Sequence, residues 1–287
     1  MFYFIRVLKV DLISKAIAFL LLFLTSSYVH AQSSNEKSSI SVSFGPAFPI
    51  GSYGNKEANG SSNGFAKPGP ALNISFSHLI KKNWGLSLTA FGQRNNYDPK
   101  AMEDAFTSQK FDGMIVSSST SPLPFPNPTP GPTTTYPNWK FEKDAWWIGG
   151  LMAGGYMQFP SRFSQDFLFT IKAQAGAVYV ESPETKGVSI TDTLIASFWQ
   201  TDSHGIGFSY TLGAGAQYNL SKKLYLITNL DYLGTSKILF KDITNTSTII
   251  KYPNNPGTTQ ISQMVMIGSG KQSIQSLNFM IGLGFTL

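Results

Sequence analysis

The chain has 287 residues, of which 14% are aromatic and only 13% are charged, and its mean hydropathy is −0.04. Soluble domains carry about 25% charged residues, so this composition disfavours a soluble β-sandwich, and the hydropathy is too low for a bundle of membrane helices. The net charge of +6 comes without a basic stripe, so no nucleic-acid partner is expected. The absence of cysteine excludes disulfide bonds, thiolate metal sites and a lipid anchor on Cys.

Residues 1–31 have the pattern of a cleavable secretory signal. The apolar run 16–24 is preceded by three basic residues, Arg6, Lys9 and Lys15. A membrane-spanning helix needs about 20 apolar residues, whereas a signal has a shorter run and then small residues at its cleavage site. We expect cleavage after Ala31 and a short periplasmic segment at 32–39; a short N-terminal core helix is the less favoured alternative.

Beyond residue 39, apolar residues recur at every second position in eight segments. These are Ile40–Ile50, Leu72–Phe76, Leu86–Ala90, Trp147–Phe159, Phe169–Tyr179, Phe208–Tyr218, Leu224–Tyr232 and Leu277–Leu287. A period of two places alternate side chains on opposite faces of a strand. The intervening positions are mostly Gly, Ser, Thr, Asn or Gln, as in a narrow lumen. The pattern predicts an all-β fold, an eight-stranded antiparallel up-and-down transmembrane β-barrel over residues 40–287.

The connections between these segments alternate between short and long. Short polar turns follow the second, fourth and sixth segments, and long connections follow the others, at 51–68, 93–144, 181–205 and 235–272. Outer-membrane barrels have short periplasmic turns and long extracellular loops, so both termini are expected in the periplasm.

A ten-stranded barrel is the alternative, if residues 249–252 and 261–267 form a membrane hairpin. Lys251, Pro253 and Pro256 suit lipid poorly. We therefore favour extracellular extensions of the last two strands.

Aromatic residues gather near both ends of the predicted strands, as in the girdles of membrane barrels. We expect a periplasmic girdle of Trp84, Phe159, Phe167, Tyr218 and Tyr225. We expect an outer girdle of Trp147, Tyr179, Phe208, Tyr210 and Tyr232.

The C-terminal octapeptide, residues 280–287, resembles the signal that the barrel-assembly machinery reads. Gly282, Phe285 and Leu287 fit that pattern, although Met280 stands where the pattern has a polar residue and Leu replaces the commoner final Phe.

The opening strand, residues 41–51, resembles that of small porin-family outer membrane β-barrel proteins common in Bacteroidota; OmpA- and OmpX-like barrels are the nearest familiar architectures. The resemblance implies a location in the bacterial outer membrane, with membrane lipid and the assembly machinery as partners. It brings no cofactor and no catalytic motif, and we expect a monomer.

Two charged residues fall on the inner face of the predicted barrel. Lys172 is out of phase with the apolar set of its strand, and so is Asp231. An unpaired charge inside an eight-stranded barrel is strongly unfavourable. We expect a lumenal ion pair that plugs the barrel; a polar path for small solutes is the alternative.

The second long connection is rich in proline, with Pro122, Pro124, Pro126, Pro128, Pro130 and Pro132. Such a segment favours an extended polyproline conformation, either as a surface arm for a ligand or as a solvated loop that resists proteolysis. We expect a structural or surface-interaction role, adhesin-like or accessory, through the extracellular loops, with a protein or glycan as ligand. A small-solute pore is the alternative.

Enzymes with this architecture include lipid A deacylases, which use a Ser-His pair. Beyond the signal only His78 and His204 remain, and His204 follows Asp202 and Ser203, but neighbours in sequence do not face each other as a triad requires. We therefore expect no catalytic residues and no metal site, and a lipid A-modifying hydrolase is only a remote alternative.

Overall fold

The computed structural model describes residues 38–56, 63–107, 138–162, 164, 166–191, 194–251 and 260–287. The predicted signal and the proline-rich segment lie outside the described residues. Among those described, no helix is long and apolar enough to cross a membrane.

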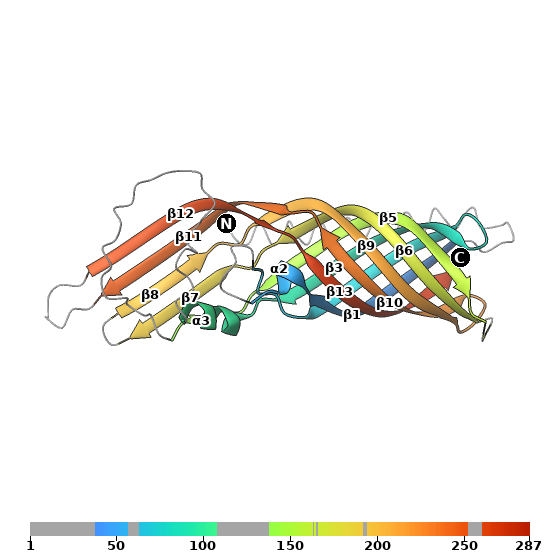
Figure 1. Ribbon diagram of the computed structural model, residues 1–287, viewed down its shortest axis with the longest axis horizontal. Coiled ribbons are helices and arrows are strands. Elements are labelled where there is room, and N and C mark those ends of the chain that lie inside the picture. The colour runs from blue at the N-terminus through green and yellow to red at the C-terminus, as the bar shows by residue number, and fades with distance from the viewer. Residues whose placement is uncertain are drawn as a thin grey trace.

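Eight antiparallel strands close into a barrel (Figure 1). In chain order they are β1 (Ser38–Pro49), β2 (Gly69–Leu79), β3 (Trp84–Asn96), β5 (Ala145–Pro160), β6 (Phe167–Glu181), β9 (His204–Asn219), β10 (Leu224–Thr235) and β13 (Gln275–Thr286). Each barrel strand pairs with the barrel strands that precede and follow it in the chain, and β13 pairs with β1 to close the barrel. The predicted eight-stranded antiparallel barrel is confirmed, and the ten-stranded alternative is wrong. The barrel begins at Ser38, two residues before the expected start.

Both ends of the barrel chain lie on one rim, which we call the terminal rim. Ser39 pairs with Thr286, and the backbone N–H of Leu287 donates to the carbonyl of Ser38 at 2.9 Å. The short turns 80–83, 161–166 and 220–223 join strands at this same rim. We call the opposite end of the barrel the sheet rim, because a second sheet begins there.

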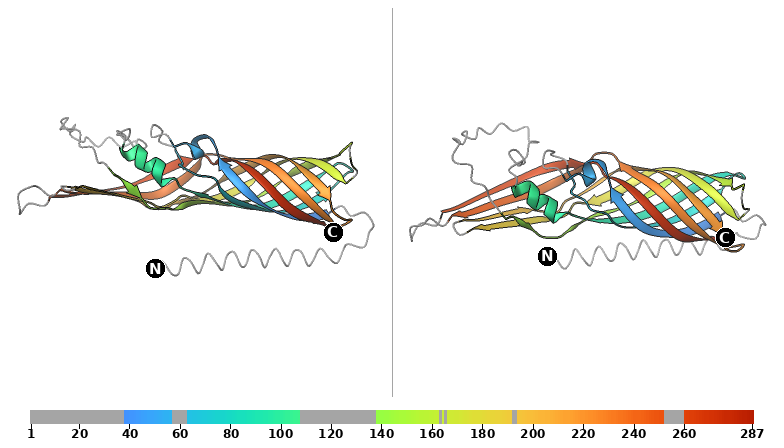
Figure 2. Two further views of the ribbon diagram at one scale, coloured as in Figure 1. Left: turned by 90° about the horizontal axis from the view of Figure 1, so that it is seen from below. Right: turned by 60° about the horizontal axis from the view of Figure 1, so that its bottom comes forward.

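That second sheet, the extension sheet, has five strands. They are β12 (Gln260–Gln272), β11 (Ile238–Lys251), β8 (Leu194–Gln200), β7 (Thr185–Thr191) and β4 (Lys140–Phe141), in this spatial order. Each directly precedes or follows one barrel strand, and the order repeats that of β13, β10, β9, β6 and β5. The extension sheet therefore prolongs five of the eight barrel strands far beyond the sheet rim (Figures 1 and 2).

The extension sheet occupies chain that the sequence analysis treated mainly as loops. The connection 181–205 folds into β7 and β8, and the connection 235–272 folds into the hairpin of β11 and β12. An alternation continues there at Val188 and Ile190, but it is shorter and more polar than in the barrel.

Two short helices lie at the sheet rim, α2 (Gly51–Gly54) and α3 (Pro99–Thr107). Helix α3 lies against the extension sheet (Figure 2). Its Phe106 ring lies 4.9 Å from that of Phe141 and 5.5 Å from that of Phe198, centroid to centroid. Helix α3 thus covers part of one face of the extension sheet, over β4, β8 and β11.

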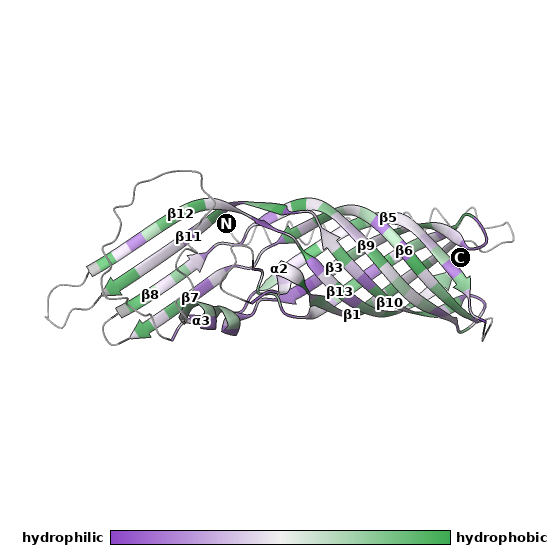
Figure 3. Cartoon of the chain, viewed as in Figure 1, coloured by the Kyte–Doolittle hydropathy of each residue, from purple (hydrophilic) through white to green (hydrophobic). Residues whose placement is uncertain are grey.

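The outward-facing side chains of the barrel are apolar and exposed, with Phe44 at 63% and Leu151 at 60% of full exposure. Hydrophobic residues recur along the barrel strands between more polar ones (Figure 3). Most of the expected girdle aromatics are at least partly exposed, but Tyr225 is buried, so its placement in the girdle is wrong. Tyr225 is out of phase with Leu224 and Leu226, which face outward, and it therefore faces the lumen.

Candidate functional site

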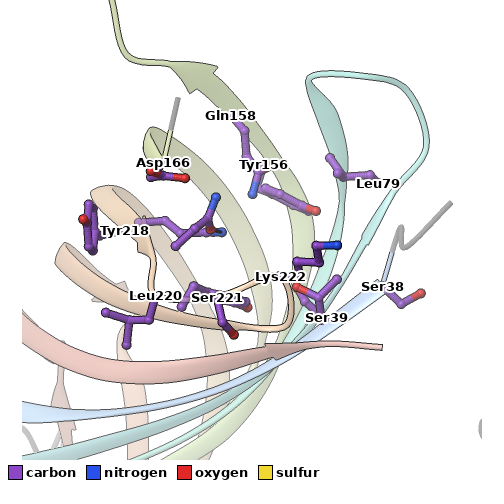
Figure 4. Close-up of a pocket in the computed structure, with 14 residues that line it drawn as sticks. Ser38, Ser39, Leu79, Tyr156, Gln158, Asp166, Tyr218, Leu220, Ser221 and Lys222 are labelled. Carbon is purple, nitrogen blue, oxygen red and sulfur yellow. Dashed lines mark hydrogen bonds between the residues drawn. The ribbon is translucent and has the colours of Figure 1, made fainter. Parts of the chain in front are cut away.

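The lumen opens at the terminal rim in a polar vestibule of about 600 Å³ (Figure 4). Gln158, Asp166, Gln217 and the rings of Tyr156 and Tyr225 line it. Such a lining can hold water and hydrogen-bond to polar groups of a solute. Any passage through the barrel would therefore have to continue from here towards the sheet rim.

The structure brings Lys172 and Asp231 together inside the barrel. The Lys172 ammonium lies 2.9 Å from Asp231 Oδ2, and only 17% and 3% of the two side chains are exposed. In the sheet register Lys172 stands beside Tyr156, a residue of the vestibule lining. The ion pair therefore follows the vestibule along the lumen.

Gly213 makes this ion pair sterically feasible. It pairs with Lys172 on one side and with Asp231 on the other, so the two charged side chains meet across its strand. A Cβ at Gly213 would meet Asp231 Oδ1 and Lys172 Cε. Sequence reasoning missed this residue, although a glycine between two inward charges in the cross-strand register is a signal that could have found it.

A polar layer surrounds the ion pair. The Gln174 amide donates to the hydroxyls of Ser87 and Thr89, both at 2.9 Å, and Asn278 donates to Gln93 at 3.4 Å. Next to these groups is a cavity of about 10 Å³, lined in part by Gln174, Asp231 and Asn278. Each of these three residues carries a buried oxygen without a hydrogen-bond partner among the described residues. A cavity of this size holds about one water molecule, which could donate to them.

An apolar layer fills the lumen between the polar layer and the extension sheet. It is one cluster of buried side chains, comprising Tyr53, Ala66, Phe91, Trp146, Ile148, Met152, Val178, Val180, Leu233, Ile238, Phe240 and Ile274. The Trp146 ring meets Tyr53 edge-on at 5.5 Å, and its indole N–H donates to the carbonyl of Gly64 at 2.9 Å. Buried side chains pack as densely as organic crystals, so this cluster obstructs the lumen beyond the ion pair.

Asp98 anchors the segments at the sheet rim. Its carboxylate lies 2.9 Å from Lys56 Nζ and 2.8 Å from Lys67 Nζ, and its Oδ1 accepts a hydrogen bond from the N–H of Ala101 in α3. Burial raises the pKa of this carboxyl, but the hydrogen bonds from Lys67, Lys56 and Ala101 outweigh burial and hold the pKa below its usual value. Asp98 therefore caps α3 as an anion.

The face of the extension sheet opposite α3, which we call its outer face, is exposed and largely apolar. The register aligns four isoleucines across four strands, Ile190, Ile195, Ile250 and Ile261. Ile190 is 63% exposed and Ile261 68%. Parallel to this row, Trp199 stands opposite Thr246, which stands opposite Val265, and Trp199 and Val265 are 45% and 55% exposed. Exposed apolar patches of this kind mark interaction sites.

Trp199 is held in place on this face. Its indole N–H donates to Glu184 at 2.7 Å, and Glu184 also lies 2.8 Å from Lys186 Nζ. The Lys186 ammonium lies 5.8 Å from the centroid of the Trp199 ring. The hydrogen bond and the cation–π contact restrict the ring, which lowers the entropy cost of binding through it.

The candidate catalytic groups do not assemble into a triad. The Ser203 hydroxyl donates to the carbonyl of Lys241 at 2.6 Å, and the His204 ring stacks on Tyr179 with 5.7 Å between centroids. His78 lies at the terminal rim, with its Nδ1 2.8 Å from the Ser38 hydroxyl. Within the described ranges no group of three or more His, Cys, Asp or Glu could hold a metal ion.

The residues of the predicted assembly signal lie on the closing strand and just beyond it. Gly282 pairs with Ser43 and faces the lumen, where a Cβ would meet the backbone of β1. Phe285 is 41% exposed on the outside, with the Lys223 ammonium 5.7 Å from its ring centroid. Leu287 follows the end of β13.

No family model matches the sequence, and no curated protein matches it. Among solved structures, Ail, the attachment invasion locus protein of Yersinia pestis, is 12% identical with a TM-score of 0.39, over 88% of this chain and 98% of that one. A major outer membrane protein from Thermus thermophilus is 11% identical with a TM-score of 0.39, over 87% and 99%. Neisserial surface protein A is 10% identical with a TM-score of 0.32, over 88% and 98%. These values assign neither a family nor an activity.

Proposed function

We propose that this protein is a bacterial outer-membrane barrel that presents the extension sheet at the cell surface for interaction with other macromolecules. A single contrast carries the proposal. The lumen is packed with side chains beyond the ion pair, whereas the extension sheet exposes a row of isoleucines and an ordered tryptophan.

The membrane location rests on the barrel exterior. Only helices and closed barrels satisfy all backbone groups in lipid, and this barrel is closed with exposed apolar side chains outside. On β5, Trp147 and Phe159 both face outward. At about 3.3 Å per residue and a tilt of about 40° they bracket roughly 30 Å of height, close to the apolar band of a membrane barrel.

The orientation follows from the connections. The terminal rim has the short turns, the start of β1 and the end of β13, so we place it in the periplasm, and the extension sheet then stands outside the cell. Cleavage of the signal at residues 1–31, recognition of Gly282, Phe285 and Leu287 by the assembly machinery, and contact with outer membrane lipid belong to the same proposal. Helix α3 and strand β4, which flank the proline-rich segment in the chain, belong to the sheet side of the molecule.

The filled lumen argues against the small-solute pore. A solute entering the vestibule meets the Lys172–Asp231 pair and then the apolar layer around Trp146. Eight strands leave an interior just wide enough for side chains to fill. A protein or glycan is the ligand class that we propose for the surface.

Surface labelling tests the orientation, because the chain has no native cysteine. Ile190→Cys on the extension sheet should react with a membrane-impermeant maleimide on intact cells that express the protein. The matched variant Lys222→Cys, in a turn of the terminal rim, should react only after the outer membrane is opened. Labelling of Lys222→Cys but not Ile190→Cys on intact cells would contradict the proposed orientation.

Two further measurements test the rest of the proposal. A folded barrel should migrate differently on a gel before and after boiling, and should be found in the outer-membrane fraction. In planar bilayers the folded protein should give no steady conductance steps, since the apolar layer closes the lumen. Regular single-channel steps would favour the pore instead.

A further inference from the structure

The two edges of the extension sheet differ sharply. At one edge, β4 has two residues, and Lys140 exposes 75% of its side chain. At the other edge, β12 has 13 residues and pairs with β11 in a continuous register from Gly268 to Gln260. Proteins usually protect sheet edges by keeping them short, charged or bulged, or by adding proline. The β4 edge has the first two of these protections.

The β12 edge has none of these protections along most of its length. From Gln260 to Gly270 the sequence contains no charged residue and no proline, and the register shift in the hairpin, between Phe240 and Ile243 on β11, lies opposite Ser269 near the barrel end of this segment. Ile261, Val265 and Ile267 are more than half exposed. In the part of the chain that the structure describes, β12 is the last strand of the sheet. Its second backbone edge is a template for another strand.

We propose that the strand received by this edge is β12 of a second copy of the protein. A strand pairs with its own copy antiparallel, about a twofold axis perpendicular to the sheet. This operation keeps the two faces of the sheet on their own sides, so the outer faces of the two extension sheets would form one continuous face, with the two isoleucine rows at opposite ends of the junction. The uncharged segment 260–270 is suited to self-pairing, because like charges directly opposite each other destabilise a pair of strands.

The symmetry also fixes which copies can meet. Two copies in one membrane are related by a twofold axis along the membrane normal. This rotation makes their β12 strands parallel, and the outer face of one extension sheet then points to the same side as the α3 face of the other. In a parallel pair, a residue whose backbone N–H and C=O point towards the partner strand lies opposite a residue whose N–H and C=O point away from it. Rotation about the membrane normal instead places two residues that both point towards the partner strand opposite each other. Direct pairing of β12 is therefore confined to copies that point in opposite directions.

Copies that point in opposite directions lie in two membranes that face each other. The inference rests on the proposed function, since it requires the extension sheet to project from the cell surface. The protein would then be a monomer within its own membrane and self-associate between membranes. With β12 strands of 13 residues fully overlapped, the paired segment is about 43 Å long at roughly 3.3 Å per residue. Many such weak contacts between two membranes act together through multivalency.

Vesicle clustering tests this pairing. The full chain after signal cleavage is folded into dilauroylphosphatidylcholine vesicles that carry a red or a green lipid dye, and mixed clusters are counted. Vesicles with the native protein should cluster, with a gap of about 43 Å or more between bilayers in electron micrographs. Empty vesicles should not. With the 13-residue strands fully overlapped, Met266 lies on the twofold axis opposite its own copy, so Met266→Cys should give disulfide-linked dimers between vesicle populations.

A charged edge provides the decisive variant. Gln263→Lys with Val265→Lys places two positive charges on the outer face of β12, opposite the incoming strand, and should reduce clustering more than about tenfold. The matched control is Thr248→Lys with Thr246→Lys, which adds the same charges on β11 directly beside those two positions, one strand away from the edge. The control should cluster like the native protein.

Charge reversal completes the experiment. Vesicles with Gln263→Glu and Val265→Glu should not cluster among themselves, but should cluster with the lysine pair. The band shift on boiling shows that each variant is folded, and maleimide labelling of Ile190→Cys shows that the sheet is outside. If the band shift and the maleimide labelling show a folded barrel with the sheet outside, but native vesicles stay dispersed or vesicles with the lysine pair cluster normally, self-pairing is wrong and the proposed function stands. If the barrel does not insert, or the sheet is inside, the proposed function and the self-pairing are both wrong.

Discussion

The barrel and the extension sheet are built from consecutive stretches of the same chain, but they solve the problem of the strand edge differently. In the barrel, β13 pairs with β1 and no edge remains. Among the described residues, no strand of the extension sheet continues β1, β2 or β3, so the sheet stays open between β12 and β4. Closure lets the barrel fill its inner face with paired polar groups, whereas the open sheet needs α3 to cover one face and leaves the other exposed. Stability therefore resides in the closed part, and recognition is available to the open part.

Breaking the lumenal ion pair should have the largest effect on stability. Asp231→Ala leaves the Lys172 ammonium buried without its partner, which should cost about 3–5 kcal/mol of unfolding free energy. The double variant with Lys172→Gln removes both charges and should recover much of this loss. Urea unfolding of the barrel in vesicles, followed by tryptophan fluorescence, measures both. A double variant as unstable as the single one would show that Lys172 is not the cause.

Filling the space at Gly213 should have a smaller but clear effect. Gly213→Ala places a Cβ against Asp231 Oδ1 and Lys172 Cε, so the ion pair must shift, at a cost of about 1–3 kcal/mol. Gly92→Ala on β3 is the matched control, because no atom lies within 4 Å of its Cβ position. The same urea titration compares the two. Equal midpoints would contradict the close packing of the ion pair on Gly213.

The stability of the α3 anchor should depend on pH through Asp98. Asp98 has its pKa lowered below 3.8 by Lys67, Lys56 and the Ala101 N–H, although burial opposes this. A lowered folded pKa stabilises the folded state above the unfolded pKa, and that stabilisation is lost as the pH falls through the folded value.

Asp98→Asn should therefore cost about 1 kcal/mol of local stability at pH 7 and almost nothing once the pH is well below 3.8. Hydrogen exchange of the Ala101 and Met102 amides at the two pH values measures the difference. A cost that grows as the pH falls would have the wrong sign for this carboxylate.

The smallest effect is expected on the outer face of the extension sheet. Glu184→Gln removes a solvent-exposed ion pair with Lys186 but keeps an oxygen that can accept from the Trp199 indole. Surface ion pairs contribute little, so the unfolding free energy should change by less than about 0.5 kcal/mol. Thermal unfolding of the variant beside the native protein checks this. A loss of several kcal/mol would show that the open sheet depends on this contact as the barrel depends on its ion pair.

The barrel could be predicted because its pattern is local. Outward and inward residues alternate along each strand, and this parity alone places Lys172 and Asp231 on the inner face. The same parity, applied to Leu224 and Leu226, turns Tyr225 inward, although an aromatic residue near a strand end is also typical of a girdle. Ile148 and Met152 also lie at inward positions, where the structure buries them in the apolar layer.

The extension sheet could not be predicted in the same way. In β7 only Val188 and Ile190 are large and apolar, and in β8 apolar residues follow one another, as in Ile195-Ala196 and Phe198-Trp199, so neither segment shows the sustained alternation of a barrel strand. Such segments become strands because a barrel strand next to each one already fixes its direction and its neighbour. Helix α3 then supplies the apolar contacts that one face of the sheet lacks.

By itself the sequence determined the eight strands of the barrel and the parity of most of their residues, because the alternation depends on residues close together in the chain. The tertiary structure alone decided that Lys172 meets Asp231 over Gly213, that aromatic and aliphatic side chains obstruct the lumen, and that five strands continue beyond the sheet rim. These features depend on pairings between residues tens of positions apart, and on a closed wall that brings opposite strands within reach of one another.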